Sequence, residues 1–497
     1  MSGRLPRTEN EGGAGSGEGS QEGAAGERVG LRHPAIPFSG SLPVEPEGAA
    51  VHSAAAASRD EGIIPEAMEH NQGIIVKQRR RRWRLWRPVL RPRSGRRLPR
   101  ELRLGNVGRL AAALPEGLRD PGFATLLQRI DESPVLSGNR VRAFFRGPET
   151  FEAMRAAIDG ARSDILLESY IFKDDATGRS LLESLASAVA RGVSVRVLAD
   201  AFGSIATRRE FWKEMRARGI EVRLFNPLFP HLWLQPFRDH RKILVVDCVT
   251  AFTGGMNIGD EYGSSLAPSR GGPWRDTHVR VDGPAAWAMA IVFTEAWHAA
   301  GGSPVALDSL EPETGGVPML VLDSRPFRGT GEMASSLAAV VAAARERIWV
   351  TNAYFAPRWR AIEALGAAAR RGVDVRILLP GRSDVPLVWH AGHGFYTALL
   401  RRGVRVFEYQ RAILHAKTAV ADDFLSLTGS SNLDFRSFHF NAECNVLMLD
   451  SETGRMFSDA FEADLKDSTE ITPELWARRS FLHRAGDAIA RRLGPIL

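Results

Sequence analysis

The chain repeats one order of apolar strands and amphipathic helices, and this duplication limits the possible folds more than any other feature. In each copy a helix, an apolar strand, a second helix and a further strand follow one another. The first copy places them at residues 151–158, 165–172, 178–190 and 191–198, and the second at 332–344, 348–354, 361–370 and 371–378. Apolar strands that alternate with amphipathic helices predict an α/β sandwich with a largely buried sheet. Two such halves predict a molecule with a pseudo-twofold axis.

The sequence around the repeats suggests three regions. The first seventy or so residues are rich in Gly, Ala, Glu, Ser and Pro and have no helical or strand period, which predicts disorder. We therefore expect a disordered segment at residues 1–105, a first repeat at 106–305 and a second repeat at 306–497.

The net charge of +7 is concentrated in one segment. Residues 77–103 contain thirteen Lys or Arg and one acid, a local charge of +12, so the rest of the chain carries −5. Arginines interleaved with tryptophans suit an anionic membrane surface, because the charges meet headgroups and the indoles prefer the interface. The residues expected to bind there are Arg79, Arg80, Arg81, Arg82, Trp83 and Trp86. The alternatives are that the segment is a solvated tail or that it binds nucleic acid. Nucleic acid is the less favoured partner.

Other features of the sequence indicate the cellular location of the protein. No uninterrupted apolar run reaches the length of about 18 residues that a transmembrane helix needs. The N-terminus lacks the layout of a signal peptide, and two cysteines cannot build a disulfide framework. We therefore expect a peripheral protein on the cytoplasmic side of the cell membrane.

Each half carries one histidine motif after its strands. The first runs from His240 through Lys242 to Asp247, and the second from His415 through Lys417 to Asp422. Both fit His-x-Lys followed by four residues and Asp. In an extended strand, residues two apart point to the same face, so His and Lys can reach one phosphate.

The match continues downstream of both motifs. An asparagine stands seventeen residues after each histidine, at Asn257 and Asn432, next to small residues that include Ser430. These residues are expected to bind a substrate phosphate, because small side chains let the backbone approach an anion and Asn can donate to its oxygens. Each half also has an acid, Asp276 or Glu443, that is expected to orient a histidine.

The predicted catalytic residues are His240, Lys242, Asp247, His415, Lys417 and Asp422. Four intervening strand residues carry the two aspartates away from the lysines, which favours a structural role for Asp247 and Asp422. His231, His278, His390 and His393 have no counterpart in the other half and are interpreted as structural or solvated. Because the lysines supply the positive charge, we expect neither a metal nor a cofactor.

With these motifs the chain resembles the phospholipase D superfamily, and within it the bacterial cardiolipin synthases without membrane spans. The resemblance covers roughly residues 140–497 and includes the stretches 170–174, 200–204, 238–242, 255–262 and 274–277. It implies two tandem phospholipase D-like repeats. It also implies a phosphatidyltransferase that makes cardiolipin from phosphatidylglycerol through a covalent phosphohistidine, with His240 as nucleophile and His415 as acid and base.

Three other functions remain open at this point. Water as the acceptor would make the protein a hydrolytic phospholipase D. A nuclease would use the same site and benefit from the basic segment. An inactive lipid-binding scaffold is disfavoured because both motifs are intact.

Overall fold

The computed structural model describes residues 104–227, 236–263, 272–307, 313–326 and 330–493. The segment predicted to be disordered, residues 1–105, lies outside the described residues except for its last two positions. These two, residues 104 and 105, begin a helix. The Arg/Trp-rich segment and His231 also fall outside the described residues.

The first repeat follows the predicted order of elements. Its elements are β1 (Leu136–Phe144), α4 (Gly147–Asp159), β2 (Asp164–Ser169), α5 (Ala176–Ala190), β3 (Ser194–Asp200), α6 (Arg209–Ala217), β4 (Glu221–Phe225), β5 (Arg238–Asp239), β6 (Lys242–Val246), β7 (Thr250–Gly254), α7 (Asp260–Gly263), β8 (His278–Asp282) and α8 (Pro284–Ala299). Helix α4 buries Phe151, Met154 and Ile158, the apolar positions that predicted it. Helix α5 begins where the side chain of Asp175 accepts a hydrogen bond from the backbone N–H of Gly178.

Apart from β5, which has no counterpart strand in the described second repeat, the second repeat has the same order, and it adds a C-terminal extension. Its elements are β9 (Val317–Ser324), α9 (Thr330–Ala343), β10 (Arg347–Asn352), α10 (Trp359–Arg370), β11 (Asp374–Pro380), α11 (Pro386–Leu400), β12 (Arg405–Tyr409), β13 (Lys417–Ala421), β14 (Leu425–Gly429), α12 (Phe435–His439), β15 (Asn441–Leu449), α13 (Ser451–Lys466), β16 (Ser468–Ile471), α14 (Pro473–Ala477) and α15 (Phe481–Leu493).

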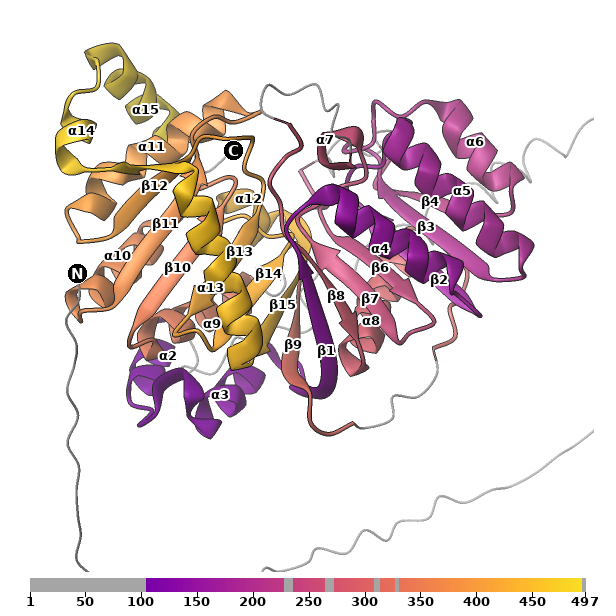
Figure 1. Cartoon of the computed structure of the whole chain (residues 1–497), viewed down its shortest axis with the longest axis horizontal. Helices are drawn as coiled ribbons and strands as arrows, with labels where there is room; N and C mark the ends of the chain where they lie inside the picture. The colour runs from indigo at the N-terminus through magenta and orange to yellow at the C-terminus, as the bar shows by residue number, and fades with distance from the viewer. Residues whose placement is uncertain (1–103, 228–235, 264–271, 308–312, 327–329, 494–497) are drawn as a thin grey trace, which may run out of the picture. The chain divides into compact units, whose positions relative to one another are not determined.

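The strands of both repeats join in one sheet (Figure 1). From one edge to the other, the order is β16-β12-β11-β10-β13-β14-β15-β9-β1-β8-β7-β6-β2-β3-β4. Apart from β16, the order on one side of the β9–β1 contact mirrors the order on the other side. Strands β1 and β9 pair antiparallel, with Leu136 opposite Met319 and Asn139 opposite Val317. The mirrored order agrees with the predicted pseudo-twofold relation between two α/β repeats.

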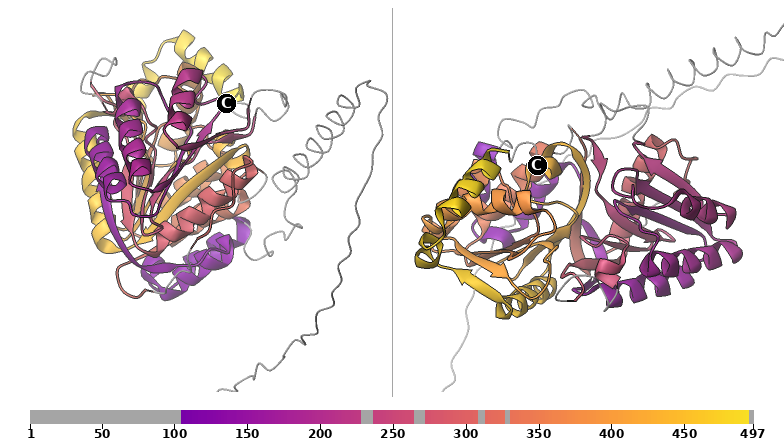
Figure 2. Two further views of the ribbon diagram at one scale, coloured as in Figure 1. Left: turned by 90° about the vertical axis from the view of Figure 1, so that its right-hand side faces the viewer. Right: turned by 90° about the horizontal axis from the view of Figure 1, so that it is seen from above.

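Helices cover both faces of each half of the sheet, as the sandwich prediction requires (Figures 1 and 2). One apolar cluster lies under α4, α5 and α6 in the first repeat. Another lies under α9, α10 and α11 in the second. A third cluster is continuous across both repeats, from Phe293 and Trp297 on α8 to Phe457 and Phe461 on α13. This shared core fixes one repeat against the other.

The packing places the start of the described chain in the second repeat. Helices α2 (Leu104–Ala112) and α3 (Pro121–Asp131) precede β1, and the predicted boundary put them in the first repeat. Their buried residues, among them Val107, Phe123 and Ile130, belong to the apolar cluster of the second repeat. In chain order these helices precede the first repeat, but their apolar faces pack against the core of the second repeat. The predicted boundary at residue 106 therefore differs from the boundary that the packing indicates.

No helix in the described ranges combines the length and the apolar character needed to cross a bilayer.

The two motif aspartates close equivalent turns at the end of each motif strand. Asp247 has φ 53° and its carboxylate accepts hydrogen bonds from the backbone N–H groups of residues 162–164 at 2.8–3.2 Å. Asp422 has φ 52° and accepts from the backbone N–H groups of residues 345–347 at 2.8–3.0 Å. Each aspartate thus joins the end of one strand to the start of its neighbour, β2 or β10.

We expect Asp247→Asn and Asp422→Asn each to lower the free energy of unfolding by about 1–3 kcal/mol. Asparagine tolerates the positive φ but removes the charge that strengthens these hydrogen bonds. Chemical denaturation measures the loss, and Asp459→Asn on the exposed face of α13 is the matched control. Losses below about 0.5 kcal/mol, the range of ordinary surface substitutions, would contradict the structural role.

Candidate active site

Each motif histidine is held by backbone of the opposite repeat. Strand β5, which precedes His240, pairs in parallel with the start of β15, and the N–H of His240 donates to the carbonyl oxygen of Ala442 at 2.9 Å. In the second motif, the N–H of His415 donates to the carbonyl oxygen of Arg275 at 2.7 Å. Ala442 and Arg275 directly precede Glu443 and Asp276, so each bond brings an acid of one repeat to the histidine of the other.

The two acids contact the histidines across the repeats. His240 Nδ1 lies 3.0 Å from Glu443 Oε2, and His415 Nδ1 lies 2.7 Å from Asp276 Oδ2. A neutral imidazole that donates from Nδ1 to a carboxylate keeps a free electron pair on Nε2. Both histidines are therefore oriented with the reactive nitrogen directed away from the acid.

Burial controls the protonation of this site. It lowers the pKa of His240 to about 4, although Glu443 works in the opposite direction. Burial and then Lys417 lower the pKa of His415. Burial disfavours the charges on both acids, but Lys417 and His415 hold the pKa of Asp276 below its usual value. His240 and Lys242 do the same for Glu443. The arrangement is thus two ionised acids beside two neutral imidazoles.

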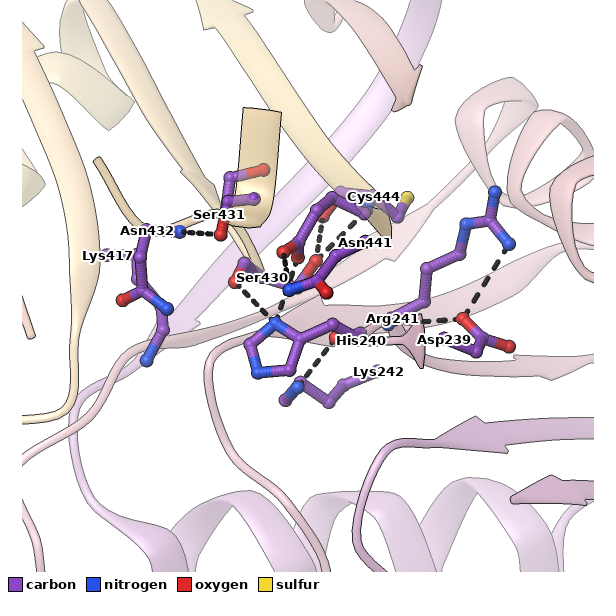
Figure 3. A network of polar contacts seen from close by, with 12 residues as sticks. Asp239, His240, Arg241, Lys242, Lys417, Ser430, Ser431, Asn432, Asn441 and Cys444 are labelled. Carbon is purple, nitrogen blue, oxygen red and sulfur yellow. Dashed lines mark hydrogen bonds and ion pairs between the residues drawn. The ribbon is translucent and has the colours of Figure 1, made fainter. Parts of the chain in front are cut away.

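The motif lysines lie next to the histidines. Lys242 Nζ donates to the carbonyl oxygen of His240 at 2.6 Å, and Lys417 Nζ lies 2.9 and 3.1 Å from the two ring nitrogens of His415. Burial lowers the pKa of Lys242 to about 7 and that of Lys417 to about 8. Figure 3 shows Lys417 on the second-repeat side of His240, and its charge acts on the pKa of His240. The four motif side chains therefore belong to one site.

Aromatic rings surround both histidines, although no role was predicted for them from the sequence. The ring centroids of Tyr170 and His240 are 4.8 Å apart. Those of Trp274, Tyr262 and Tyr354 lie 5.5–5.8 Å from His415. The chain has only five tyrosines, and three of them are here. Their scarcity, and the position of Tyr170 and Tyr354 just beyond β2 and β10, were the available signals.

The predicted phosphate-binding residues reach the site in different ways. Asn257 Nδ2 donates to the hydroxyl of Tyr262 at 3.2 Å, and that hydroxyl lies 3.2 Å from His415 Nδ1. The side-chain oxygen of Asn432 is buried without a hydrogen-bond partner among the described residues. Asn257 is therefore linked to His415 through Tyr262, whereas the side-chain oxygen of Asn432 is buried with its hydrogen-bonding capacity unused in the described chain.

The contacts of Ser430 are not those expected of a phosphate-binding residue. Its hydroxyl accepts from the backbone N–H of Cys444 at 3.0 Å and also stabilises the charged form of Glu443, while its carbonyl oxygen lies 3.1 Å from His240 Nδ1 (Figure 3). The hydroxyl thus contacts the acid that orients His240, and phosphate binding by Ser430 stays a prediction. The matching residue of the first repeat is Gly255, where a Cβ would lie 2.2 Å from Asp276 Oδ1.

Asp247 and Asp422 do not reach the site. Each stands five residues after its motif lysine along an extended strand, which corresponds to about 16 Å. Their carboxylates bind the backbone turns described above. The two aspartates were predicted among the catalytic residues, and these contacts correct that prediction. The structural role that the spacing favoured agrees with the geometry.

Asp200 fixes the segment that leads into His240. This buried residue ends β3, and its carboxylate accepts from the N–H of Asp239 at 2.9 Å and contacts Arg238 at 3.3 Å. Burial raises the pKa of Asp200 to about 6. The stretch 200–204, which is part of the resemblance, thus positions the backbone just before His240.

Arg241 adds an ionic contact between the repeats. It occupies the variable position of the first motif, where the second motif has Ala416. Its guanidinium lies 2.5 Å from Asp323 at the end of β9 and 3.5 Å from Glu168 (Figure 3 shows its position beside Asp239). This residue therefore distinguishes two otherwise similar half-sites.

The other histidines that were interpreted as structural or solvated have different surroundings. His278 is buried, and neither of its ring nitrogens has a hydrogen-bond partner in the described chain. His390 and His393 lie away from the motifs, in a cluster with His483 and Asp487.

Comparison with known proteins gives a consistent result. The family model described as "Cardiolipin synthase, PLD-like domain" matches residues 154–264 and 337–465. Cardiolipin synthase A of Pseudomonas aeruginosa is 37% identical over 376 residues, which is 75% of this chain and 76% of that protein. Cardiolipin synthase 1 of Bacillus anthracis is 32% identical over 432 residues, 84% of each chain.

The fold has a counterpart among solved structures. The phosphatidylserine synthase of Haemophilus influenzae superimposes with a TM-score of 0.58 at 12% sequence identity, over 74% of this chain and 96% of that one. At this identity the likeness concerns the fold alone. Taken with the matched family model and the relatives, the paired motifs show that the chain belongs to the cardiolipin synthase family of the phospholipase D superfamily.

Proposed function

We propose that this protein is a phosphatidyltransferase that joins two phosphatidylglycerol molecules into cardiolipin and releases glycerol. The observation that carries the proposal is one buried site in which two neutral histidines, each oriented by an acid from the opposite repeat, lie beside two lysines. Transfer through a covalent intermediate needs a nucleophile and a proton donor. The cardiolipin synthase relatives support the choice of lipid.

In the first step, Nε2 of His240 attacks the phosphorus of a donor phosphatidylglycerol. The bond from phosphorus to the headgroup glycerol oxygen breaks, and the leaving oxygen takes a proton from the imidazolium form of His415. The anionic phosphate, together with Asp276, favours that protonated form. The products are a phosphatidyl group on His240 and free glycerol.

In the second step, a glycerol hydroxyl of another phosphatidylglycerol attacks the same phosphorus. Neutral His415 accepts the proton of that hydroxyl, and the phosphorus–nitrogen bond to His240 breaks. Both histidines return to their initial state, so two phosphatidylglycerols give one cardiolipin and one glycerol. The lysines and asparagines would hold the non-bridging oxygens while charge develops on them.

Burial favours transfer to lipid over hydrolysis. The motif histidines are 7% and 4% exposed, and aromatic rings pack around them. A phosphohistidine accepts water or an alcohol, so transfer depends on holding the alcohol in line and limiting access of water. Hydrolytic phospholipase D activity is therefore the disfavoured alternative.

We further propose that residues 77–103 bind the anionic cytoplasmic face of the cell membrane and bring the site to its substrate. The charge of +12 and the tryptophans at positions 83 and 86 support this role.

Replacement of either histidine tests the division of roles. We expect His240→Ala and His415→Ala each to lower turnover by at least about 10³-fold, because each step needs both groups. With an activated donor that needs no proton for its leaving group, His415→Ala should accumulate a phosphatidyl adduct on His240, detected by mass spectrometry. His298→Ala, on the exposed end of α8, is the control and should keep normal turnover. An adduct found on His415 of the wild type and not on His240 would reverse the roles.

Product analysis tests the acceptor. Phosphatidylglycerol labelled in its acyl chains and in its headgroup glycerol should yield cardiolipin and free glycerol in equal amounts. His240→Ala should form neither product. Phosphatidic acid as the main product at saturating lipid would assign the protein to the hydrolases.

Deletion of residues 77–103 tests the membrane contact. Each basic residue near an anionic surface contributes about 1 kcal/mol, so the deletion should weaken binding to phosphatidylglycerol vesicles, and salt should weaken wild-type binding similarly. Turnover of a short-chain lipid dispersed in detergent should persist. Unchanged vesicle binding would mean that the segment is only a solvated linker, and a gain of nucleic-acid affinity from the segment would favour the alternative partner.

A further inference from the structure

A second cluster of ionisable side chains lies on the outer helices of the second repeat. His390 and His393 stand three residues apart on α11, and His483 and Asp487 stand four apart on α15. Such spacings place both members of a pair on one face of a helix. One nitrogen or oxygen atom from each of the four residues lies within 4.8 Å of the others. None of the four belongs to the site of the motif histidines.

Small residues allow the two helices to approach closely at this point. A Cβ on Gly394 would lie 2.8 Å from the Cβ of Arg491, and a Cβ on Gly486 would lie 4.0 Å from His390 Nδ1. The close approach brings the two pairs of side chains together.

His393 is held as a metal-binding histidine usually is. Its Nε2 lies 3.0 Å from Glu408 Oε1, and its Nδ1 is buried without a hydrogen-bond partner among the described residues. Donation from Nε2 to a carboxylate fixes the tautomer and leaves an electron pair on Nδ1. The Nδ1 atom lies 3.7 Å from Asp487 Oδ1, an acceptor that also lies 2.9 Å from His390 Nδ1. Two acceptors that face each other in the interior require a cation or a proton between them.

The other ligands are also partly prepared. Asp487 Oδ2 is bound by Arg479, which leaves Oδ1 directed at the histidines, 2.9 Å from His390 Nδ1. His483 is exposed, whereas His393 and Asp487 are buried.

We propose that His390, His393, His483 and Asp487 bind one Zn²⁺ ion that fastens the C-terminal helix α15 to α11. Three imidazole nitrogens and one carboxylate oxygen form a complete tetrahedral ligand set for zinc. Tetrahedral bonds of the usual length separate neighbouring ligand atoms by roughly 3.4 Å. The atoms of the cluster lie within 4.8 Å of one another, so side-chain rotation must draw the widest pair together by up to about 1.4 Å. With four protein ligands the site is closed, which is the arrangement of a structural ion.

The competing explanation is a proton. A doubly protonated His393 could bridge Glu408 and Asp487 without any metal. The two explanations differ in whether the cluster binds Zn²⁺ with defined stoichiometry, and this can be measured on the full-length protein.

The experiment compares chelator-treated wild type with His390→Ala/His483→Ala after addition of Zn²⁺. Competition with a chromophoric chelator should show one more tight site per chain in the wild type. Each single substitution should weaken that site by roughly 100-fold or more, and Glu408→Gln by about 10–100-fold through loss of the orienting carboxylate. Co²⁺ at the site should give the visible absorption of a tetrahedral complex. Zn²⁺ should raise the Tm of the wild type but not that of the double variant.

Two controls separate this site from other histidines. His298→Ala removes an exposed histidine elsewhere, and His240→Ala removes a motif histidine; both should keep the additional zinc site. Because His483 is exposed, His483→Ala should fold normally, which circular dichroism verifies. Equal zinc stoichiometry and affinity in the wild type and the double variant would overturn the proposal and leave the bridging proton as the explanation.

Discussion

The exchange of acids between the repeats is the contact on which the active site depends. Glu443 of the second repeat binds His240 of the first, and Asp276 of the first binds His415 of the second. Each contact is accompanied by a backbone hydrogen bond to the same histidine from the residue before the acid. A single repeat would therefore hold a histidine without its acid and an acid without its histidine. The joined sheet and the continuous core between α8 and α13 keep both contacts in place at once.

Burial of charge is the second constraint. Lys242 and Lys417 lie in an interior that lowers the pKa of each to about 7 and about 8, and both acids stay ionised through the same lysines and histidines. With both lysines protonated, their two positive charges balance the two carboxylates. A phosphate diester adds a further negative charge, so binding of substrate stabilises the protonated lysines and the imidazolium that protonates the leaving group. The same burial limits access of water, which is the condition for transfer to a lipid alcohol.

The sequence predicted the elements that local patterns encode and missed those that depend on tertiary contacts. The repeated strands, the helix that buries Phe151 and Ile158, and the two motifs follow from periodicity and spacing. The pairing of His240 with Glu443 joins residues 203 positions apart, and no local signal indicates which acid serves which histidine. The contact of the Ser430 hydroxyl with Cys444 was not expected, because only the fold brings these two residues together. Helices α2 and α3 were assigned by chain order, whereas their apolar residues belong to the core of the second repeat.

The proposed covalent intermediate has a consequence for the configuration of the phosphorus atom. Each in-line displacement inverts its configuration, so attack by a histidine followed by attack of the acceptor alcohol restores it. A phosphatidylglycerol made chiral at phosphorus with a sulfur substituent, used as the donor, allows the configuration of the cardiolipin product to be determined. Overall retention is the result expected for two histidines that act in one site. Overall inversion would mean direct transfer between lipids and would contradict the covalent role of His240.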